Sequence, residues 1–158
     1  MPYIECESYA HRFAKQTLAE WFREKYKANK NHSYPTSYYI FDWLPQTGDG
    51  VYLEYPLLSR KVNGKSEVFG VNKWSKYPVL PPTNPDIIVE GVLDVAVCSK
   101  GKLVYGFEIV HKHKCGPKKI SFLKYLRTTY GIPVYEISAS WILDQIKRPP
   151  NLSLSLVG

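Results

Sequence analysis

Cysteine is scarce in this sequence, and its three thiols form no recognisable pair. Cys6, Cys98 and Cys115 lie far apart, and none of them belongs to a CxxC motif. An odd number of distant cysteines argues against the disulfide framework that small secreted domains use. It favours free thiols in a reducing compartment.

Long apolar runs are also absent. Residues 1–13 lack the uninterrupted apolar stretch of a signal peptide, and no segment approaches the roughly 18 apolar residues of a membrane span. We therefore expect a soluble, intracellular protein of the cytoplasm or nucleus, with no membrane partner.

Acidic residues are in the minority. The 158 residues include 14 Asp and Glu against 21 Lys and Arg, which gives a net charge of +7. This excess of cations suits a polyanionic partner, DNA or RNA, although a basic structural or interaction module would also have it. The length and the 44% hydrophobic content fit one domain with a buried core.

The spacing of apolar residues predicts an α/β fold. Helical spacing occurs in residues 7–28, 118–130 and 140–146, and runs typical of strands occupy 38–44, 51–58, 87–98, 103–110 and 132–138. The helix at 118–130 connects two strands, which should therefore run parallel. We expect a single domain over residues 1–158, with a central mixed β-sheet flanked by helices.

Two segments are less regular. Residues 59–85 combine a basic insert, which could form an extra hairpin, with a proline-rich link that cannot be helix or central strand. Residues 151–158 alternate polar and apolar side chains, which fits either an edge strand or a loose tail.

Two carboxylates occupy symmetric places in the hairpin predicted at 87–110. Asp94 lies seven residues before Gly101 and Glu108 seven after it, so the two should face each other within apolar strands. A buried charge costs several kcal/mol unless it is paired or bound to a metal, and a divalent ion would relieve the repulsion between two acids. Glu54, in another apolar strand, is a third candidate ligand. The alternative is that each acid pairs with a cation or points to solvent.

Other polar residues could complete or surround this site. Glu7, His11 and Lys15 are four residues apart, so they follow one side of the first helix and could contact a metal-bound water or a phosphate; the alternative is a solvated first turn. His111, His113 and Cys115 would share one strand face and could bind zinc, although their spacing fits no known finger. The alternative is a strand end whose histidines face solvent or touch nucleic acid.

In order along the chain, these motifs resemble the competence-protein CoiA-like and related branches of the PD-(D/E)XK nuclease superfamily. The resemblance rests on H-x-x-x-K (His11, Lys15), LEYPLL, LDVAV, FEIVHKH, KKISFLKYL and GIPVYEISA, the last carrying Glu136. It covers the first helix and most of the chain from residue 50 onward, apart from the insert and link at 59–85. No single motif is diagnostic.

The resemblance implies a restriction-endonuclease-like core and hydrolysis of phosphodiester bonds. Asp94 and Glu108 would bind Mg²⁺ or Mn²⁺, and Glu54 would complete the metal site. Val110 stands where the motif has its lysine, so Lys15 or Lys112 would have to replace that group. A nuclease-like domain that only binds nucleic acid is therefore the alternative.

Basic and histidine side chains outside the carboxylate pair are candidates for binding nucleic acid, with DNA as the expected partner. They are His11, Arg60, Lys61, His111, His113, Lys118 and Lys119. The sequence leaves the oligomeric state open, and a homodimer is among the alternatives.

Overall fold

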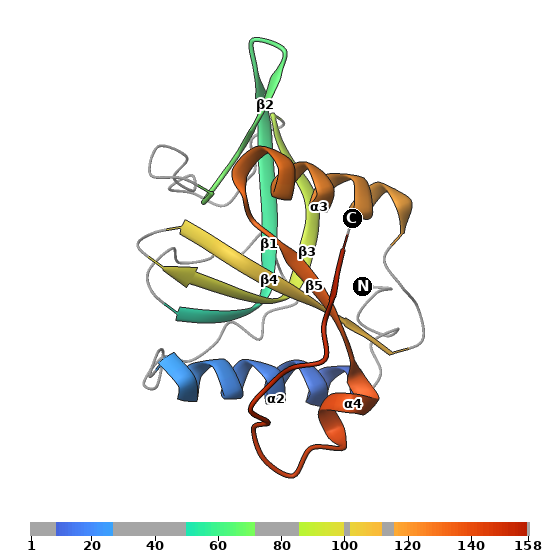
Figure 1. The fold of residues 1–158 in the computed structure, drawn as a ribbon. Helices are drawn as coiled ribbons and strands as arrows, with labels where there is room; N and C mark the ends of the chain where they lie inside the picture. Colours follow the sequence, from blue (N-terminus) through green and yellow to red (C-terminus); the bar gives the residue numbers. More distant parts are fainter. Residues whose placement is uncertain (1–8, 27–49, 72–85, 100–101, 112–115, 158) are drawn as a thin grey trace.

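A computed structural model describes residues 9–26, 50–71, 86–99, 102–111 and 116–157 (Figure 1). The strand expected at 38–44 and the proline-rich link lie outside these ranges. Within them, no helix is both long and apolar enough to cross a membrane.

The described chain is an α/β fold with a six-stranded mixed sheet and three helices, as the sequence predicts. The elements are α2 (Tyr9–Tyr26), β1 (Gly50–Val62), β2 (Lys65–Val68), β3 (Ile87–Ser99), β4 (Lys102–Val110), α3 (Pro117–Tyr130), β5 (Val134–Ser138), α4 (Ala139–Leu143) and β6 (Ser155–Leu156). The strand order is β2-β1-β3-β4-β5-β6. Only β4 and β5, which α3 connects, pair in parallel.

Helices cover both faces of the sheet (Figure 1). Helices α2 and α4 lie against one face, where Leu18 and Phe22 join a core that includes Val95, Phe107 and Ile137. Helix α3 lies against the other face. Its Leu123 and Leu126 join a second core. These two cores hold the sheet between the helices and fix the positions of the polar side chains that each helix carries.

Along strands β1 and β3, the side chains switch from one face of the sheet to the other at paired positions. Leu53 and Val95 are paired and belong to the α2-side core, whereas Tyr55 and Leu93 are paired and belong to the α3-side core. Residues two apart normally share one face of a strand, so the alternation reverses at the residues between these pairs. On β1 that residue is Glu54, whose φ of 52° lies in the left-handed region.

Several expected boundaries are confirmed and one is wrong. Helix α3 ends at Gly131, whose φ of 70° permits the left-handed C-cap. Residues 59–68 form the extra hairpin, and residues 155–156 form an edge strand. The helix expected at 140–146 instead ends at Leu143, because Ile146 is fully exposed and two prolines follow at 149 and 150.

Candidate carboxylate site

The candidate site lies where β3 separates from β4. The antiparallel ladder between them runs from Ser99 and Lys102 to Val95 and Phe107 and goes no further. Beyond that point β3 continues beside β1, while β4 continues beside β5 as far as Val110 (Figure 1). Asp94 is therefore the first residue of β3 beyond the ladder, at the fork between the strands.

At the fork, the side chain of Asp94 accepts a hydrogen bond that a backbone carbonyl of β3 would accept in a continued ladder. Its Oδ2 accepts a hydrogen bond from the backbone N–H of Ile109 at 2.8 Å. His11 Nε2, from α2, lies 3.3 Å from the same oxygen and 3.1 Å from the carbonyl oxygen of Ile109. Both of these oxygens are acceptors, so Nε2 must carry the proton. His11 therefore fixes the Asp94 carboxylate from the helix side.

Glu108 follows Phe107, the last β4 residue of that ladder, just as Asp94 precedes Val95, its last β3 residue. Glu108 is buried and forms an ion pair with the ammonium of Lys119, from α3. The negative charge of Asp94 is close enough to act on the Glu108 carboxyl. The expectation that these acids meet across adjacent strands stays a prediction: both lie at the fork, but Asp94 is held from α2 and Glu108 from α3, the helices on opposite faces of the sheet.

The two acids titrate in opposite directions. Burial alone would raise the pKa of Asp94, but the His11 hydrogen bond and charge, the charge of Lys15 and the Ile109 N–H together hold it below its ordinary value. Burial, and then the negative charge of Asp94, raise the pKa of Glu108 to about 8, although Lys119 opposes both effects. At neutral pH Asp94 is therefore ionised, and Glu108 retains most of its proton.

Glu54 lies on β1 between Leu53 and Tyr55, whose strand partners flank Asp94 on β3, but its carboxylate is held by another partner. Its carboxylate forms an ion pair with Lys15, whose ammonium comes from α2 and is almost wholly buried. In the described part of the chain, no three His, Cys, Asp or Glu side chains are grouped closely enough to hold a metal ion. The predicted third ligand is thus neutralised by a lysine in this arrangement.

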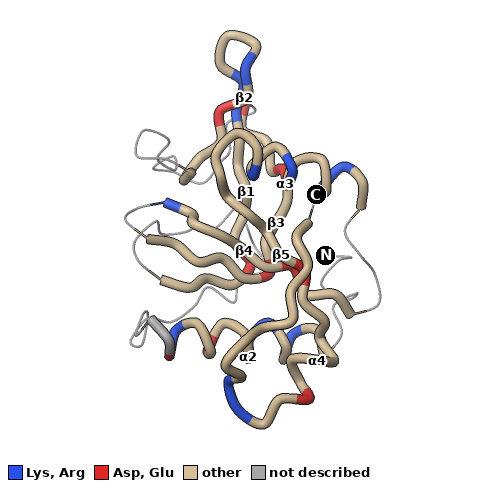
Figure 2. The backbone as a smooth tube through the Cα atoms, viewed as in Figure 1, with Lys and Arg blue, Asp and Glu red and all other residues tan. Residues whose placement is uncertain are grey.

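Glu136 adds a fourth carboxylate to this row. It pairs in register with Glu108 across the parallel strands β4 and β5, and it is half-buried. Residues paired in this way have side chains on the same face of a sheet. Figure 2 shows acidic positions gathered across the middle of the sheet. Sequence reasoning named Glu136 only as part of a motif, because its strand register depends on the crossover through α3.

Lys119 has a position in the site that sequence reasoning missed. Its Nζ donates to the carbonyl of Val92 at 2.7 Å as well as pairing with Glu108. The aliphatic part of its side chain passes over Gly91, where an added Cβ would lie 3.4 Å from Lys119 Cε. A glycine inside a strand often marks the close approach of another group, and Gly91 was the available signal.

The remaining predicted contacts are less closely connected to the acids. Arg60, Lys61, Lys118 and His111 are exposed, whereas His11 and Lys119 are engaged with the carboxylates. Lys112 and His113 lie outside the described residues.

The zinc alternative gains no further ligand from Cys98. Cys98 is buried at the far end of the β3–β4 hairpin from His111, and burial raises the pKa of its thiol to about 12. Cys115 lies outside the described residues.

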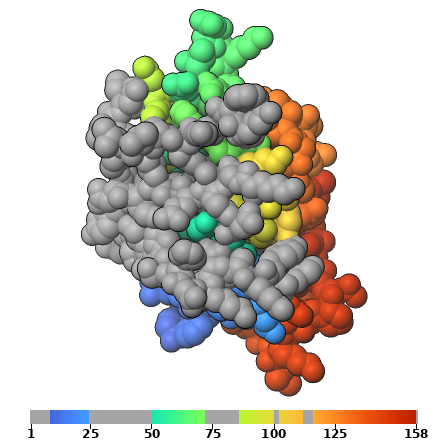
Figure 3. All heavy atoms as spheres, turned by 90° about the vertical axis from the view of Figure 1, so that its left-hand side faces the viewer, coloured from blue at the N-terminus to red at the C-terminus, as the bar shows by residue number. Residues whose placement is uncertain are grey.

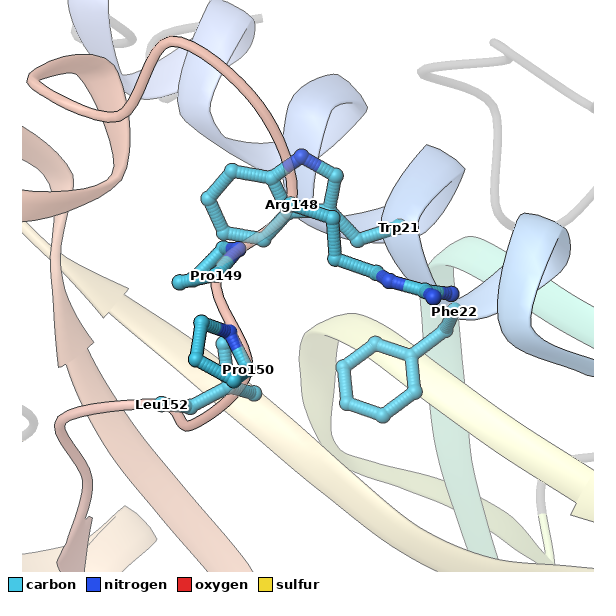
Figure 4. Close-up of a pocket in the computed structure, with 6 residues that line it drawn as sticks. All are labelled: Trp21, Phe22, Arg148, Pro149, Pro150 and Leu152. Atoms are coloured by element: carbon cyan, nitrogen blue, oxygen red, sulfur yellow. The ribbon is translucent and has the colours of Figure 1, made fainter.

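A separate hollow of about 170 Å³ lies between α2 and the C-terminal segment (Figure 4). It is lined by Trp21, Phe22, Arg148, Pro149, Pro150 and Leu152. Trp21 is six residues beyond Lys15, about 9 Å along the helix axis. The hollow has no carboxylate in its lining and does not contribute to the fork.

Comparison with known proteins gives no family assignment: no family model, no curated protein and no solved structure matches this chain.

Proposed function

We propose that this protein is a metal-dependent nuclease of the PD-(D/E)XK type. The observation that carries the proposal is the Asp94–Glu108 pair, two acids at the point where two central strands separate, one held by His11 and the other by Lys119. The order of elements agrees with the core that the sequence resemblance implies. It consists of a helix, three antiparallel strands, a crossover helix and a parallel strand.

The chemistry of the donor set fits Mg²⁺ or Mn²⁺. Mg²⁺ commonly binds to proteins through one or two carboxylates and keeps several waters, so Asp94 and Glu108 can suffice without a third protein ligand. Burial, and then the negative charge of Asp94, raise the pKa of Glu108, and a divalent cation would favour the ionised form of both acids. When bound, such an ion would polarise the phosphate and lower the pKa of a bound water.

The chain's own cations would position and neutralise the substrate. Val110 cannot supply the ammonium of the family motif, but Lys119 places one directly beside Glu108. The Lys119 side chain is 27% exposed, against 5% for Lys15, so Lys119 has the better access to an incoming phosphate. Lys15 remains with Glu54, and His11 holds Asp94 in its orientation.

The test is hydrolysis of labelled DNA and RNA with each divalent ion, together with a chelator control. Asp94→Asn keeps the side-chain volume but weakens the metal site, so cleavage should collapse while binding through lysines and arginines survives. Cleavage that is equally fast in the Asp94→Asn protein would refute the proposed site.

One observation favours a second candidate, a nuclease-like domain that binds nucleic acid without cutting it. Lys15 neutralises Glu54. The Asp94–Glu108 pair carries one negative charge while Glu108 is protonated, and Lys119 supplies one positive charge beside it, so the site is close to charge balance without a metal. In that case Mg²⁺ should leave the thermal stability unchanged, and the wild-type and Asp94→Asn proteins should bind DNA equally without cleaving it.

A further inference from the structure

The hairpin formed by the end of β1 and β2, residues 59–68, projects from the rest of the described chain (Figures 1 and 3). Its pairs run from Ser59 and Val68 to Val62 and Lys65. The two turn residues, Asn63 and Gly64, have φ values of 52° and 78°, as a tight two-residue turn requires. The seven residues 60–66 are all exposed, so this ribbon is free to enter a partner.

The hairpin carries positive charge on both of its faces. Cross-strand partners share a face and successive residues alternate, so Arg60 and Lys65 lie on one face and Lys61 on the other. Glu67 is the single acid in residues 59–68, and it pairs with Arg60 at 3.3 Å. A ribbon that lay flat on a polyanion would need cations on one face only. This distribution instead fits a ribbon with phosphates on both sides.

The hairpin is also fixed to the body of the protein. The hydroxyl of Tyr125, from α3, donates to the carbonyl of Ser66 at 3.4 Å. The Arg60 guanidinium lies 5.6 Å from the centre of the Phe69 ring. The hairpin is therefore held in a defined direction relative to the carboxylate row before any ligand binds.

These dimensions favour one form of nucleic acid. Paired strands lie about 4.8 Å apart, and the major groove of B-form DNA, about 12 Å wide, admits a two-stranded ribbon between its two backbones. The major groove of A-form RNA is too deep and narrow for side chains to read. From Glu54 to Val62, β1 advances eight residues, at most about 26 Å, or the length of roughly eight base pairs.

We propose that this hairpin inserts into the major groove of double-stranded DNA, within about eight base pairs of the phosphate held at the carboxylate row. The inference rests on the proposed function and extends it by naming B-form duplex DNA as the substrate. Lys61 contacts one backbone, and Arg60 and Lys65 contact the other.

The experiment measures binding of the full chain in a buffer with chelator and no divalent ion, so that cleavage does not interfere. The ligands are a DNA duplex of about 20 base pairs, roughly two helical turns, its single strand, and an RNA duplex of the same sequence. The test protein is Lys61→Ser/Lys65→Ser. The matched control is Lys124→Ser/Lys147→Ser, which removes two exposed lysines from α3 and the C-terminal segment.

Loss of two phosphate contacts should lower the slope of log K against log salt by roughly 1.8 and weaken duplex binding about tenfold or more. The control should change the salt slope and the duplex affinity far less. On single-stranded DNA and on duplex RNA, the hairpin variant and the control should bind alike. A DNA duplex whose major groove is filled by glucosylated hydroxymethylcytosine should weaken binding of the wild-type protein but not of the hairpin variant.

Two other results separate the possible failures. If the wild-type protein binds DNA but the hairpin and control variants lose equal affinity, or if it prefers single strands, the hairpin proposal is wrong and the proposed function stands. If the wild-type protein binds none of the three ligands at low salt, the proposed function fails and this inference fails with it.

Discussion

Asp94 accepts a hydrogen bond from the backbone N–H of Ile109 at the point where β3 and β4 separate. This bond satisfies a buried donor that has lost its strand partner, so the acid has a structural role in addition to any chemical one. The same oxygen is near His11 Nε2, which ties α2 to the fork.

Asp94→Leu should therefore destabilise the protein by about 1–3 kcal/mol, because it leaves the Ile109 N–H without an acceptor. Asp94→Asn retains a carbonyl oxygen at this position and should cost less. Urea unfolding of the three proteins at pH 7 measures the difference. Equal losses for the two variants would show that the hydrogen bond to Ile109 does not matter.

The stability of the protein should depend on the protonation of Glu108. Its pKa is raised in the folded state to about 8, from an ordinary value of 4.5. A raised pKa contributes stability that is complete below about pH 4.5 and is lost as the pH rises to about 8. Glu108→Gln cannot ionise, so it should escape this loss.

Between pH 5 and pH 8, the free energy of unfolding of Glu108→Gln should rise relative to wild type by on the order of 2 kcal/mol. Urea unfolding at several pH values measures this. Glu136→Gln, which removes a carboxylate from the next strand, is the control for the loss of one charge from the sheet. Parallel wild-type and Glu108→Gln curves would contradict the raised pKa.

Gly106 should tolerate no side chain. A Cβ at this position would lie 2.7 Å from Leu93 Cδ1 and 3.3 Å from the carbonyl oxygen of Val95. Gly106→Ala should cost roughly 1–3 kcal/mol, because the strand or the Leu93 side chain must move. Gly116→Ala has no atom within 4 Å of the new Cβ and serves as the control. Equal changes in melting temperature for the two variants would contradict the close packing of Leu93 on β4.

Much of the fold follows from local pattern in the sequence. The hairpin of β3 and β4 follows from two β-rich runs around a glycine turn, and the parallel placement of β5 follows from its crossover helix. The positions of Asp94 and Glu108 on either side of Gly101 place both acids just beyond the end of the β3–β4 ladder. Register is less predictable, because a bulge between Val97 and Cys98 shifts it by one residue, and counting from the turn alone would place Asp94 opposite Phe107.

The rest of the site depends on contacts between distant elements. The side-chain alternation in β1 reverses at Glu54 because of a backbone conformation that no residue pattern indicated. Likewise, the capture of Glu54 by Lys15 and of Glu108 by Lys119 depends on how α2 and α3 pack on the sheet. A charged residue on a helix could equally have faced solvent, so tertiary packing decided these partners.

Lys119 should be the lysine on which cleavage depends most. Lys119→Met keeps an unbranched side chain over Gly91 but removes the ammonium beside Glu108, and it should lower the rate of DNA cleavage by roughly 100-fold or more. Lys118→Met, which removes the neighbouring exposed lysine, should affect salt-dependent binding more than the rate at saturating DNA. Gly91→Leu should resemble Lys119→Met, because a bulky side chain would displace the Lys119 methylenes that now lie 3.4–3.7 Å from the new Cβ. Single-turnover rates at saturating DNA separate these effects from weaker binding. Should Lys15→Met abolish cleavage while Lys119→Met leaves it intact, the ammonium on α2 would be the functional one, and Lys119 would serve only to neutralise Glu108.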